Sequence, residues 1–486
     1  MKPALGDVGK VVRCIERERQ ALLQFKEGLI DDYGVLSSWG NSSTEDCCKW
    51  RGVQCSNRTG HVKALNLHVP SYIYQPLRGK ISPSLLELQH LKYLDLSNNN
   101  FTGSHIPEFI GSFSRLQYLD LSVDDFEGTI PNQFGNLSEL RSLDLGYNYE
   151  LSVKSYLHGI ISPQLPLTNS SALSLAVLDL SSNYFNSSIY SWLFNFNTSL
   201  VHVDLSENNL QGLIPDSFRN LNSLAYLHLS YNQLEGGIPK SIGNCTSLQT
   251  LNLGWNQLSS LPDLTRLSSL RVLDLSNNRL TGSLPKNIGQ LFMLEILDVS
   301  SNSLQGTISE THLSNLNNLK HLGLSDNSLS LDFSSDWNPP SQLDVINLRS
   351  CLLGPRFPNW LLTQNNYSHL DISNSGISDI VPREFWNLSP ILSYINLSSN
   401  HMNGMVPDLT SLKTVFYPEI DLSYNRFECQ MPLSPPNITA LNLSKNMFFG
   451  SVSFLCSISN KLLSFIDYQI IDYQGSFLIA GCICMN

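Results

Sequence analysis

The stretch LRVLDLSNN (residues 270–278) decides the fold, because it recurs along the chain with the template L-x-x-L-x-L-x-x-N. Clear copies begin at Leu91, Leu140, Leu175, Leu200, Leu224, Leu248, Leu270, Leu294 and Leu319. Weaker copies begin at Val62, Leu116, Leu343, Tyr367, Leu392, Tyr417 and Ile438, which gives sixteen repeats. Most intervals are 24 or 25 residues. A period of this length indicates a stack of similar units rather than several globular domains.

The spacing within the template predicts the structure of each repeat. The L-x-L segment alternates as a β-strand does, so both leucines face one side and the residue between them faces the other. One repeat cannot bury its leucines alone, but stacked repeats can, and their strands then form one parallel sheet. The final Asn both donates and accepts hydrogen bonds, so we expect it to hold the turn after each strand. This ladder comprises Asn99, Asn148, Asn183, Asn208, Asn232, Asn256, Asn278, Asn302, Asn327, Asn400, Asn425 and Asn446.

Between the strands the chain often reads G-x-I-P, as in GTIP (128–131), GLIP (212–215) and GGIP (236–239). Glycine permits the turn and proline fixes the backbone angle after it. A 24-residue repeat with this segment resembles the plant-specific extracellular subtype of leucine-rich repeat. The resemblance implies a leucine-rich-repeat solenoid, an α/β-type right-handed superhelix with the parallel β-sheet on its concave face.

Four cysteines, Cys14, Cys47, Cys48 and Cys55, lie within the first 55 residues. They could form two disulfides or a zinc site, but no histidine stands at ligand spacing and a glycan acceptor follows at 57–59. Both observations favour disulfides in a secreted protein. Residues 16–29, ERERQALLQFKEGL, have helical spacing that puts Leu22, Phe25, Leu29 and Ile30 on one side.

The stretches 14–39 and 46–55 together resemble the N-terminal cap of plant receptor-like proteins and receptor kinases. That resemblance implies a cap over residues 14–60, with Cys14 bonded to Cys47 and Cys48 to Cys55. The stretches 338–364 and 370–386 resemble the middle of membrane-anchored receptor-like proteins that sense microbial proteins, the branch that includes fungal-xylanase receptors. This second resemblance implies that the protein recognises an extracellular protein or peptide in plant innate immunity. It also implies signalling through partner receptor kinases at the plasma membrane.

Three alternatives remain open. The first is a soluble inhibitor of microbial cell-wall-degrading enzymes, similar to polygalacturonase inhibitors. The second is a co-receptor for a growth signal or peptide hormone, and the third is a non-functional truncated paralogue. The sequence contains no G-x-S-x-G, P-loop, H-E-x-x-H or dinucleotide-binding motif, so we expect neither catalysis nor a cofactor nor a metal. The net charge of −11 disfavours a nucleic-acid partner.

The ends depart from the repeat. We interpret residues 1–13 as a leader remnant, 61–461 as the repeats with an irregular coil at 148–171, and 462–486 as a broken repeat with an unrelated tail. The pattern stops after Asp467, which a retained intron or premature stop would explain. A natural short form, or an unusual cap built from Cys456, Cys482 and Cys484, are the alternatives. No segment of the sequence has the roughly 18 apolar residues of a membrane span, and the start has no apolar signal core.

The concave face is the expected binding surface. Asp occupies the position between the strand leucines in nine repeats, and we interpret this acidic column as part of the repeat consensus rather than a site for a basic ligand. More variable positions carry aromatic and charged side chains, which are common in binding hot spots. The candidate ligand-binding residues are Tyr226, His228, Trp255, Arg271, Tyr231, His202, Lys320 and Arg349.

Thirteen N-x-S/T sequences predict N-glycosylation and support secretion. They are at Asn41, Asn57, Asn100, Asn136, Asn169, Asn186, Asn197, Asn244, Asn366, Asn387, Asn396, Asn437 and Asn442. Asn396 and Asn442 occupy the position between the strand leucines. Glycans there would cover the later part of the concave face and direct a protein ligand to earlier repeats.

Overall fold

The computed structural model describes residues 13–40, 46–70, 75–150, 155–157, 175–194, 199–411, 417–433, 438–450, 465–467, 470–471 and 477–478. The chain divides into two compact units, Met1–Leu234 and Glu235–Asn486. Each unit is a solenoid of repeats, and each is described by itself.

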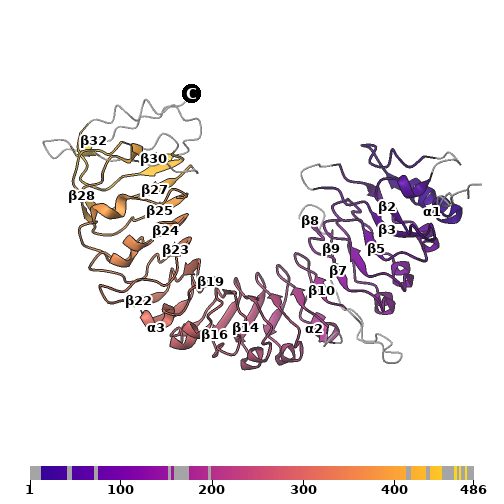
Figure 1. The fold of residues 1–486 in the computed structure, drawn as a ribbon, viewed down its shortest axis with the longest axis horizontal. Helices are drawn as coiled ribbons and strands as arrows, with labels where there is room; N and C mark the ends of the chain where they lie inside the picture. The colour runs from indigo at the N-terminus through magenta and orange to yellow at the C-terminus, as the bar shows by residue number, and fades with distance from the viewer. Residues whose placement is uncertain are drawn as a thin grey trace, which may run out of the picture. The chain divides into compact units, whose positions relative to one another are not determined.

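The first unit is built on a parallel sheet in which every strand comes from one repeat (Figure 1). Its strands are β3 (Val62–Asn66), β5 (Tyr93–Asp95), β6 (Tyr118–Asp120), β7 (Ser142–Asp144), β10 (Val177–Asp179), β11 (His202–Asp204) and β13 (Tyr226–His228). Equivalent template positions pair without slippage, as in Leu143 with Leu178 and Leu178 with Val203. The period therefore fixes the register, and side chains of equivalent positions form columns across the sheet.

The second unit repeats this arrangement (Figure 1). Its strands are β15 (Thr250–Asn252), β17 (Val272–Asp274), β19 (Ile296–Asp298), β21 (His321–Gly323), β23 (Val345–Asn347), β24 (His369–Asp371), β25 (Tyr394–Asn396), β27 (Glu419–Asp421), β29 (Ala440–Asn442) and β30 (Phe465–Asp467). Strand β30 belongs to the broken repeat and still pairs in register with β29. The remainder of the predicted tail lies mostly outside the described residues.

Short elements form the N-terminal cap and the return paths of the coils. The short strands are β1 (Leu29–Ile30), β2 (Val53–Cys55), β4 (Arg78–Gly79), β8 (Tyr149–Glu150), β9 (Ser155–Tyr156), β12 (Gln211–Leu213), β14 (Gln233–Gly237), β16 (Gln257–Ser260), β18 (Thr281–Gly282), β20 (Ser303–Ser309), β22 (Ser328–Asp332), β26 (Asn403–Gly404), β28 (Arg426–Phe427), β31 (Ile470–Ile471) and β32 (Phe477–Leu478). The helices are α1 (Glu16–Glu27), α2 (Ile189–Leu193), α3 (Glu310–Leu313) and the 3₁₀ helices η1 (Cys47–Lys49), η2 (Pro83–Glu87), η3 (Glu108–Ser112), η4 (Asn132–Asn136), η6 (Asp216–Asn220), η7 (Lys240–Asn244), η8 (Lys286–Gln290), η9 (Asn359–Thr363), η10 (Arg383–Trp386) and η11 (Leu409–Ser411).

The G-x-I-P segment produces these return paths. In GLIP, Gly212 adopts φ +75°, which glycine adopts without steric cost. Pro215 follows in an extended conformation and caps η6. The isoleucine between them, Ile214, is buried together with the strand leucines. One short motif therefore makes the turn, starts the helix and adds a side chain to the core.

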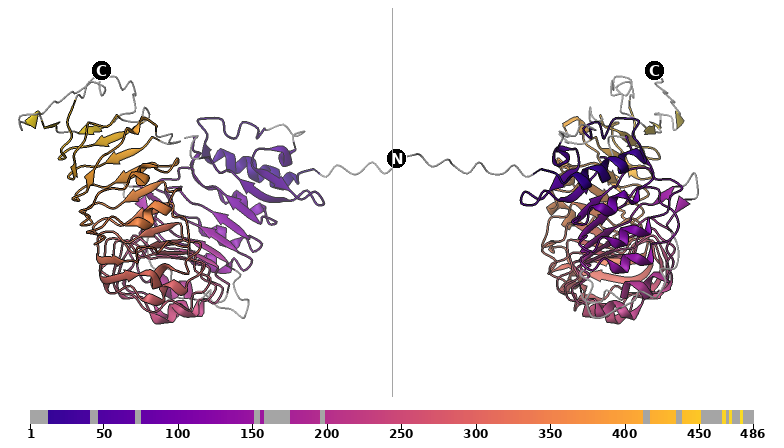
Figure 2. Two further views of the ribbon diagram at one scale, coloured as in Figure 1. Left: turned by 60° about the vertical axis from the view of Figure 1, so that its left-hand side comes forward. Right: turned by 90° about the vertical axis from the view of Figure 1, so that its right-hand side faces the viewer.

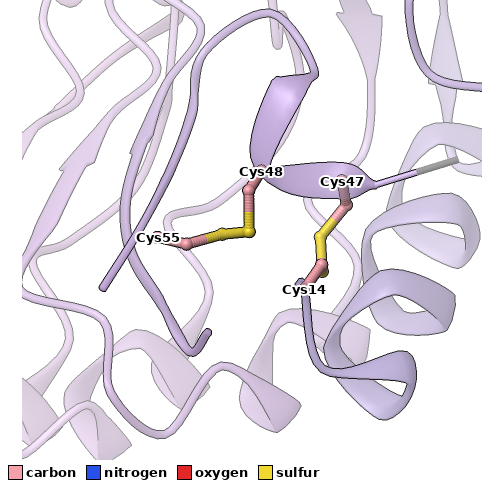
Figure 3. Close-up of side chains that lie close together, drawn as sticks. All are labelled: Cys14, Cys47, Cys48 and Cys55. Carbon is pink, nitrogen blue, oxygen red and sulfur yellow. A yellow bond between two sulfur atoms is a disulfide. The ribbon is translucent and has the colours of Figure 1, made fainter. Parts of the chain in front are cut away.

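The N-terminal cap lies beside the first strands, as the two views of Figure 2 also show for α1. Its two disulfides join Cys14 to Cys47 and Cys48 to Cys55, the pairing that the resemblance implies (Figure 3). Strand β2 pairs antiparallel with β3 and covers the outer edge of the sheet. An exposed sheet edge invites pairing with other chains, so the cap protects the edge as well as the apolar core.

One detail of the cap differs from the sequence interpretation. Helix α1 ends at Glu27, and Leu29 and Ile30 instead form β1, which pairs with β4. Ile30 is 50% exposed, whereas Leu22 and Phe25 are fully buried as expected. The pairing with Arg78–Gly79 determines this outcome, and helical spacing alone could not reveal that partner.

Nine of the twelve ladder asparagines are buried, and Asn278, Asn302 and Asn327 are half-buried. They bond to two successive coils. Asn232 is representative: its Nδ2 donates to the carbonyls of Leu229 (3.1 Å) and Leu205 (2.9 Å), and its Oδ1 accepts the Leu210 amide (2.9 Å). Leu229 belongs to its own repeat and Leu205 to the preceding one. Such carboxamides satisfy backbone groups that burial would otherwise leave unpaired, although the Oδ1 of Asn183 is itself buried without a donor.

Four of the sixteen repeats carry another residue in the ladder column, and one of these is an acid. Asp124 is fully buried; its Oδ1 accepts the Asn99 amide at 2.8 Å, while its Oδ2 is buried without a hydrogen-bond donor. Burial raises the pKa of Asp124 well above its ordinary value. The native side chain is therefore a neutral acid at mildly acidic pH, and its ionisation opposes folding at higher pH.

Asp124→Asn should therefore stabilise the protein at pH 7–8, by about 1–3 kcal/mol, because the amide restores a permanent donor. The folded-state pKa is raised, so the wild-type contribution is complete below the unfolded pKa and is lost as pH rises. The gain should thus shrink as pH falls towards 4. Thermal unfolding between pH 4 and 8 measures it, and the reverse change Asn148→Asp should destabilise with the same pH trend. A gain that is independent of pH would contradict this interpretation.

Candidate functional site

The candidate site is the sheet face, defined here as the strand side chains of each unit that point away from the leucine core. In the first unit, Tyr93 and Tyr118 stack with ring centroids 4.3 Å apart. Their hydroxyls donate to Asp95 and Asp120, each at 3.0 Å. Equivalent positions on neighbouring strands thus hold flat, half-buried aromatic rings edged by carboxylates.

A histidine-containing cluster lies further along the same face. His202 stacks on Tyr226 with ring centroids 4.0 Å apart. His228 Nδ1 lies 3.0 Å from Asp204 Oδ2 and 3.1 Å from the Tyr226 hydroxyl, while Ser230 contacts its Nε2 at 2.7 Å. Three of the predicted ligand-binding residues, His202, Tyr226 and His228, are therefore in one network.

The electrostatics of this cluster depend on the ion pair between His228 and Asp204. Burial alone would raise the pKa of Asp204, but its hydrogen bond to His228, the histidine charge and Ser206 outweigh burial and lower it. Burial lowers the pKa of His202, although Asp204 and Asp179 oppose the shift. The cluster therefore offers a neutral ring, His202, beside a firmly ionised carboxylate.

The acidic column mostly serves the scaffold. Asp95, Asp204 and Asp371 each accept both the amide and the hydroxyl of the serine two residues later. Asp144 is an exception because Gly146 occupies the serine position and supplies only its amide, at 2.9 Å. Burial, followed by the charges of Asp179 and Asp120, raises the pKa of Asp144 to about 7.

Among the residues that the structure describes, two groups of side chains have the spacing of a possible metal site. The four cap cysteines are all in disulfides. Asp179, His202 and Asp204 place one ligand atom each within 4.8 Å of one another. The oxygens of Asp204 already accept bonds from Ser206 and His228, so a cation would have to displace them, and we assign no metal site here.

In the second unit the sheet face is more highly charged. Glu295 accepts from Arg271 at 2.7 Å and from Lys320 at 2.9 Å, and both hydrogen bonds lower its pKa. Arg349 lies 3.4 Å from Asp326. These basic side chains are about half exposed or more, so each can still contact a ligand. Arg271, Lys320 and Arg349 are the predicted ligand-binding residues of this unit, together with Trp255.

Bulky side chains occupy a strained column just before the ladder. Tyr147, Tyr231 and Trp255 have φ between 53° and 55° and are 50–56% exposed. Tyr424, which sequence inspection missed although it precedes Asn425 in the same column, has φ 53° and is 57% exposed. This left-handed conformation suits Asn or Gly and is costly for bulky residues. Aromatic residues at these positions are therefore more costly to the fold than Asn or Gly would be. Because strained residues cluster at functional sites, their presence favours a role in binding.

Most predicted glycan acceptors within the described residues are accessible. Asn57, Asn136, Asn186, Asn244, Asn366 and Asn387 are exposed. Asn396 and Asn442 are half-buried, and their Nδ2 atoms donate to the Tyr394 hydroxyl (3.0 Å) and to Asp421 (3.2 Å). Asn41, Asn169, Asn197 and Asn437 lie outside the described residues, and glycan occupancy at every acceptor stays a prediction.

Tyr424→Asn should raise the free energy of unfolding by about 1 kcal/mol, because Asn tolerates the left-handed conformation that costs other residues 1–2 kcal/mol. Asn277→Tyr, at the equivalent position (φ 54°) of another repeat in the same unit, should lower it by a similar amount. Urea unfolding of the two variants measures both effects. A loss of stability in Tyr424→Asn would show that the tyrosine ring packs usefully on the scaffold.

Asp144→Asn and Asp204→Asn should change stability with opposite signs. The raised pKa of Asp144 means that its contribution is lost as pH rises towards 7, so Asp144→Asn should gain stability over wild type across that range. Asp204 has a lowered pKa, so its contribution is present at neutral pH and is lost in acid. Asp204→Asn should therefore be destabilised at pH 7 and approach wild type below pH 3. Thermal unfolding across this pH range distinguishes the two variants. Parallel pH profiles of their stability would contradict the prediction of opposite signs.

Known protein families and individual relatives match this architecture. Residues 15–56 match the leucine rich repeat N-terminal domain, residues 198–402 a leucine-rich repeat region, and residues 90–113 a leucine rich repeat. The tomato (Solanum lycopersicum) receptor-like proteins EIX2 and EIX1 are each 39% identical, over 95% and 90% of this chain. The chain spans 60% and 57% of their lengths.

Solved plant ectodomains share the fold. The leucine-rich-repeat ectodomain of the Arabidopsis receptor kinase HAESA, in complex with an IDA peptide hormone, superposes with a TM-score of 0.65 at 25% identity, covering 94% of this chain and 82% of that one. The ectodomain of the Arabidopsis thaliana receptor kinase GASSHO1/SCHENGEN3 gives 0.66 at 26% identity, covering 93% and 59%. Across the described residues, no helix combines the length and the apolar character needed to cross a membrane. The chain belongs to the leucine-rich-repeat proteins, within the group that includes the plant receptor-like proteins.

Proposed function

We propose that this chain is the ligand-recognising part of a non-catalytic plant cell-surface receptor that binds a microbial protein or peptide and signals in defence with partner receptor kinases. The observation that carries the proposal is the sheet face of each unit. It concentrates half-exposed aromatic and charged side chains, among them exposed tyrosine and tryptophan rings in a left-handed backbone conformation that is costly for bulky residues.

The chemistry of this face suits a protein ligand. Tyr, Trp and Arg dominate binding hot spots because they combine large contact area with directed hydrogen bonds. His202 and Tyr226 provide a flat stacked surface, and Arg271 and Lys320 provide cations that share one carboxylate. Different repeats could thus bind basic or acidic parts of a protein surface. Repeats without such side chains would contribute only to the shape complementarity of the interface.

The relatives support a role in defence and in assembly with partners. The structure of HAESA with the peptide hormone IDA also contains the co-receptor SERK1, a precedent for a repeat ectodomain that binds ligand and partner together. The similarity to the fungal-xylanase receptor branch makes a fungal xylanase the first ligand to test. Inhibition of polygalacturonase remains the alternative function, and it predicts a different assay result.

The test uses the full chain, secreted from plant cells so that disulfides and glycans form, and a purified fungal xylanase as probe. Biolayer interferometry should show saturable binding that Tyr226→Ala weakens at least about tenfold, as expected for a hot spot. Leu213→Ala changes a residue that is 66% exposed in β12, outside the sheet face, and should have no effect. Receptor kinases should co-precipitate only when the xylanase is present.

Absence of saturable xylanase binding, combined with inhibition of a fungal polygalacturonase by the same preparation, would replace the receptor proposal by the inhibitor alternative. Equal weakening by Tyr226→Ala and Leu213→Ala would remove the sheet face as the binding surface.

A further inference from the structure

A hollow of about 360 Å³ lies in the second unit, among the segments that follow strands β22 and β23. It is lined by the stretches 331–335 and 353–360, which belong to two successive coils. These segments are return paths and not part of the sheet face. The volume falls at the lower end of the 300–1,000 Å³ range of small-molecule sites. The hollow is therefore the size of a site for a small ligand, separate from the proposed protein-binding surface.

Aromatic side chains form its walls. Trp360 is 5% exposed and packs edge-to-face against Phe333, with ring centroids 6.1 Å apart. Trp337 stacks on Phe333 with ring centroids 4.3 Å apart and contacts Trp360 edge-to-face at 6.4 Å. Phe357 is 4% exposed and makes an edge-to-face contact with Phe385 at 5.1 Å. These rings support one another, so the walls are formed before any ligand arrives.

One charged group of the hollow lacks a partner. Arg356 lines the hollow, is exposed, and has no ion pair or hydrogen bond within the described part of the chain. Its guanidinium is a donor that acceptor oxygens of a bound molecule would satisfy. The indole Nε1 of Trp360 is enclosed by protein atoms and is therefore not a contact for a ligand.

The other residues that line the hollow restrict the class of ligand that it could bind. Asn359 adds a carboxamide and Asp332 a carboxylate. An aromatic acid could satisfy Arg356 but would offer no hydroxyl to Asp332. Inorganic phosphate would gain nothing from the aromatic walls. A sugar ring presents apolar C–H faces to aromatic rings and hydroxyls to carboxylate and amide groups, and a carboxylate on that ring would pair with Arg356.

We propose that this hollow binds a uronic-acid residue of an oligosaccharide, with Arg356 holding its carboxylate and Asp332 its hydroxyls. The aromatic cluster of Phe333 and Trp360 forms the apolar wall against the ring. The site is independent of the protein ligand proposed for the sheet face.

The test titrates trigalacturonic acid into the full secreted chain by isothermal calorimetry. Wild type should bind saturably, and Arg356→Gln should weaken binding at least about tenfold, because a charge-assisted bond is lost. Asp332→Asn should weaken it less. Arg349→Gln removes the same charge from the sheet face of the same unit and serves as the matched control, expected to bind as wild type does. A neutral galactose trimer should bind at least about tenfold more weakly.

Three results would overturn the proposal: no saturable binding of trigalacturonic acid, equal affinity for the neutral trimer, or unchanged affinity in Arg356→Gln and Asp332→Asn. Binding of benzoate with the same dependence on Arg356 but no binding of the uronate would reassign the hollow to aromatic acids. Xylanase binding is measured on the same variants. Arg356→Gln should leave it intact, so failure of this site and failure of the receptor proposal can be told apart.

Discussion

The buried carboxamide that connects successive coils is the interaction on which the rest of the structure depends. Asn400 donates to carbonyls at Leu397 of its own repeat and Ile372 of the preceding one, and accepts two amides, from Ser375 and Ile377. Such a group costs several kcal/mol if buried alone, but here it is satisfied on both sides. It fixes the spacing of neighbouring strands, and with it the columns of side chains on the sheet face.

The ladder is weakest in the part of the second unit that contains the hollow. Cys351 and Ser375 replace Asn in two successive repeats. The thiol of Cys351 donates to Leu324 at 3.3 Å, and the Ser375 hydroxyl lies 3.1 Å from the Ser373 carbonyl of its own repeat and 3.4 Å from the Leu348 carbonyl of the preceding one. A thiol or hydroxyl has a single donor proton, so neither side chain can donate to two coils at once as a carboxamide does. The return paths of these repeats also depart from G-x-I-P, so local regularity is relaxed where the aromatic hollow forms.

Sequence periodicity predicted the strands, their register and the burial of the leucines, because one template position has the same environment in every repeat. It could also place Tyr226 and Arg271 on the sheet face, since strand alternation decides the side to which they point. It could not find the end of α1 before Leu29, which depends on pairing with residues 78–79. Nor could it find the hollow, because Phe333 and Trp360 meet through loops that share no period.

The two candidate surfaces differ in what they require of the scaffold. The sheet face is repetitive, so a protein ligand can be matched by changing exposed positions without disturbing the leucines or the ladder. The hollow is a single local packing of aromatic rings, in which Trp360 is both a wall and a core residue. Substitutions on the sheet face can therefore alter specificity at little cost in stability. Substitutions of the aromatic residues inside the hollow alter binding and folding together, whereas Arg356 and Asp332 are exposed. This difference makes these two residues the informative positions for separating a sugar site from a structural feature of the coil.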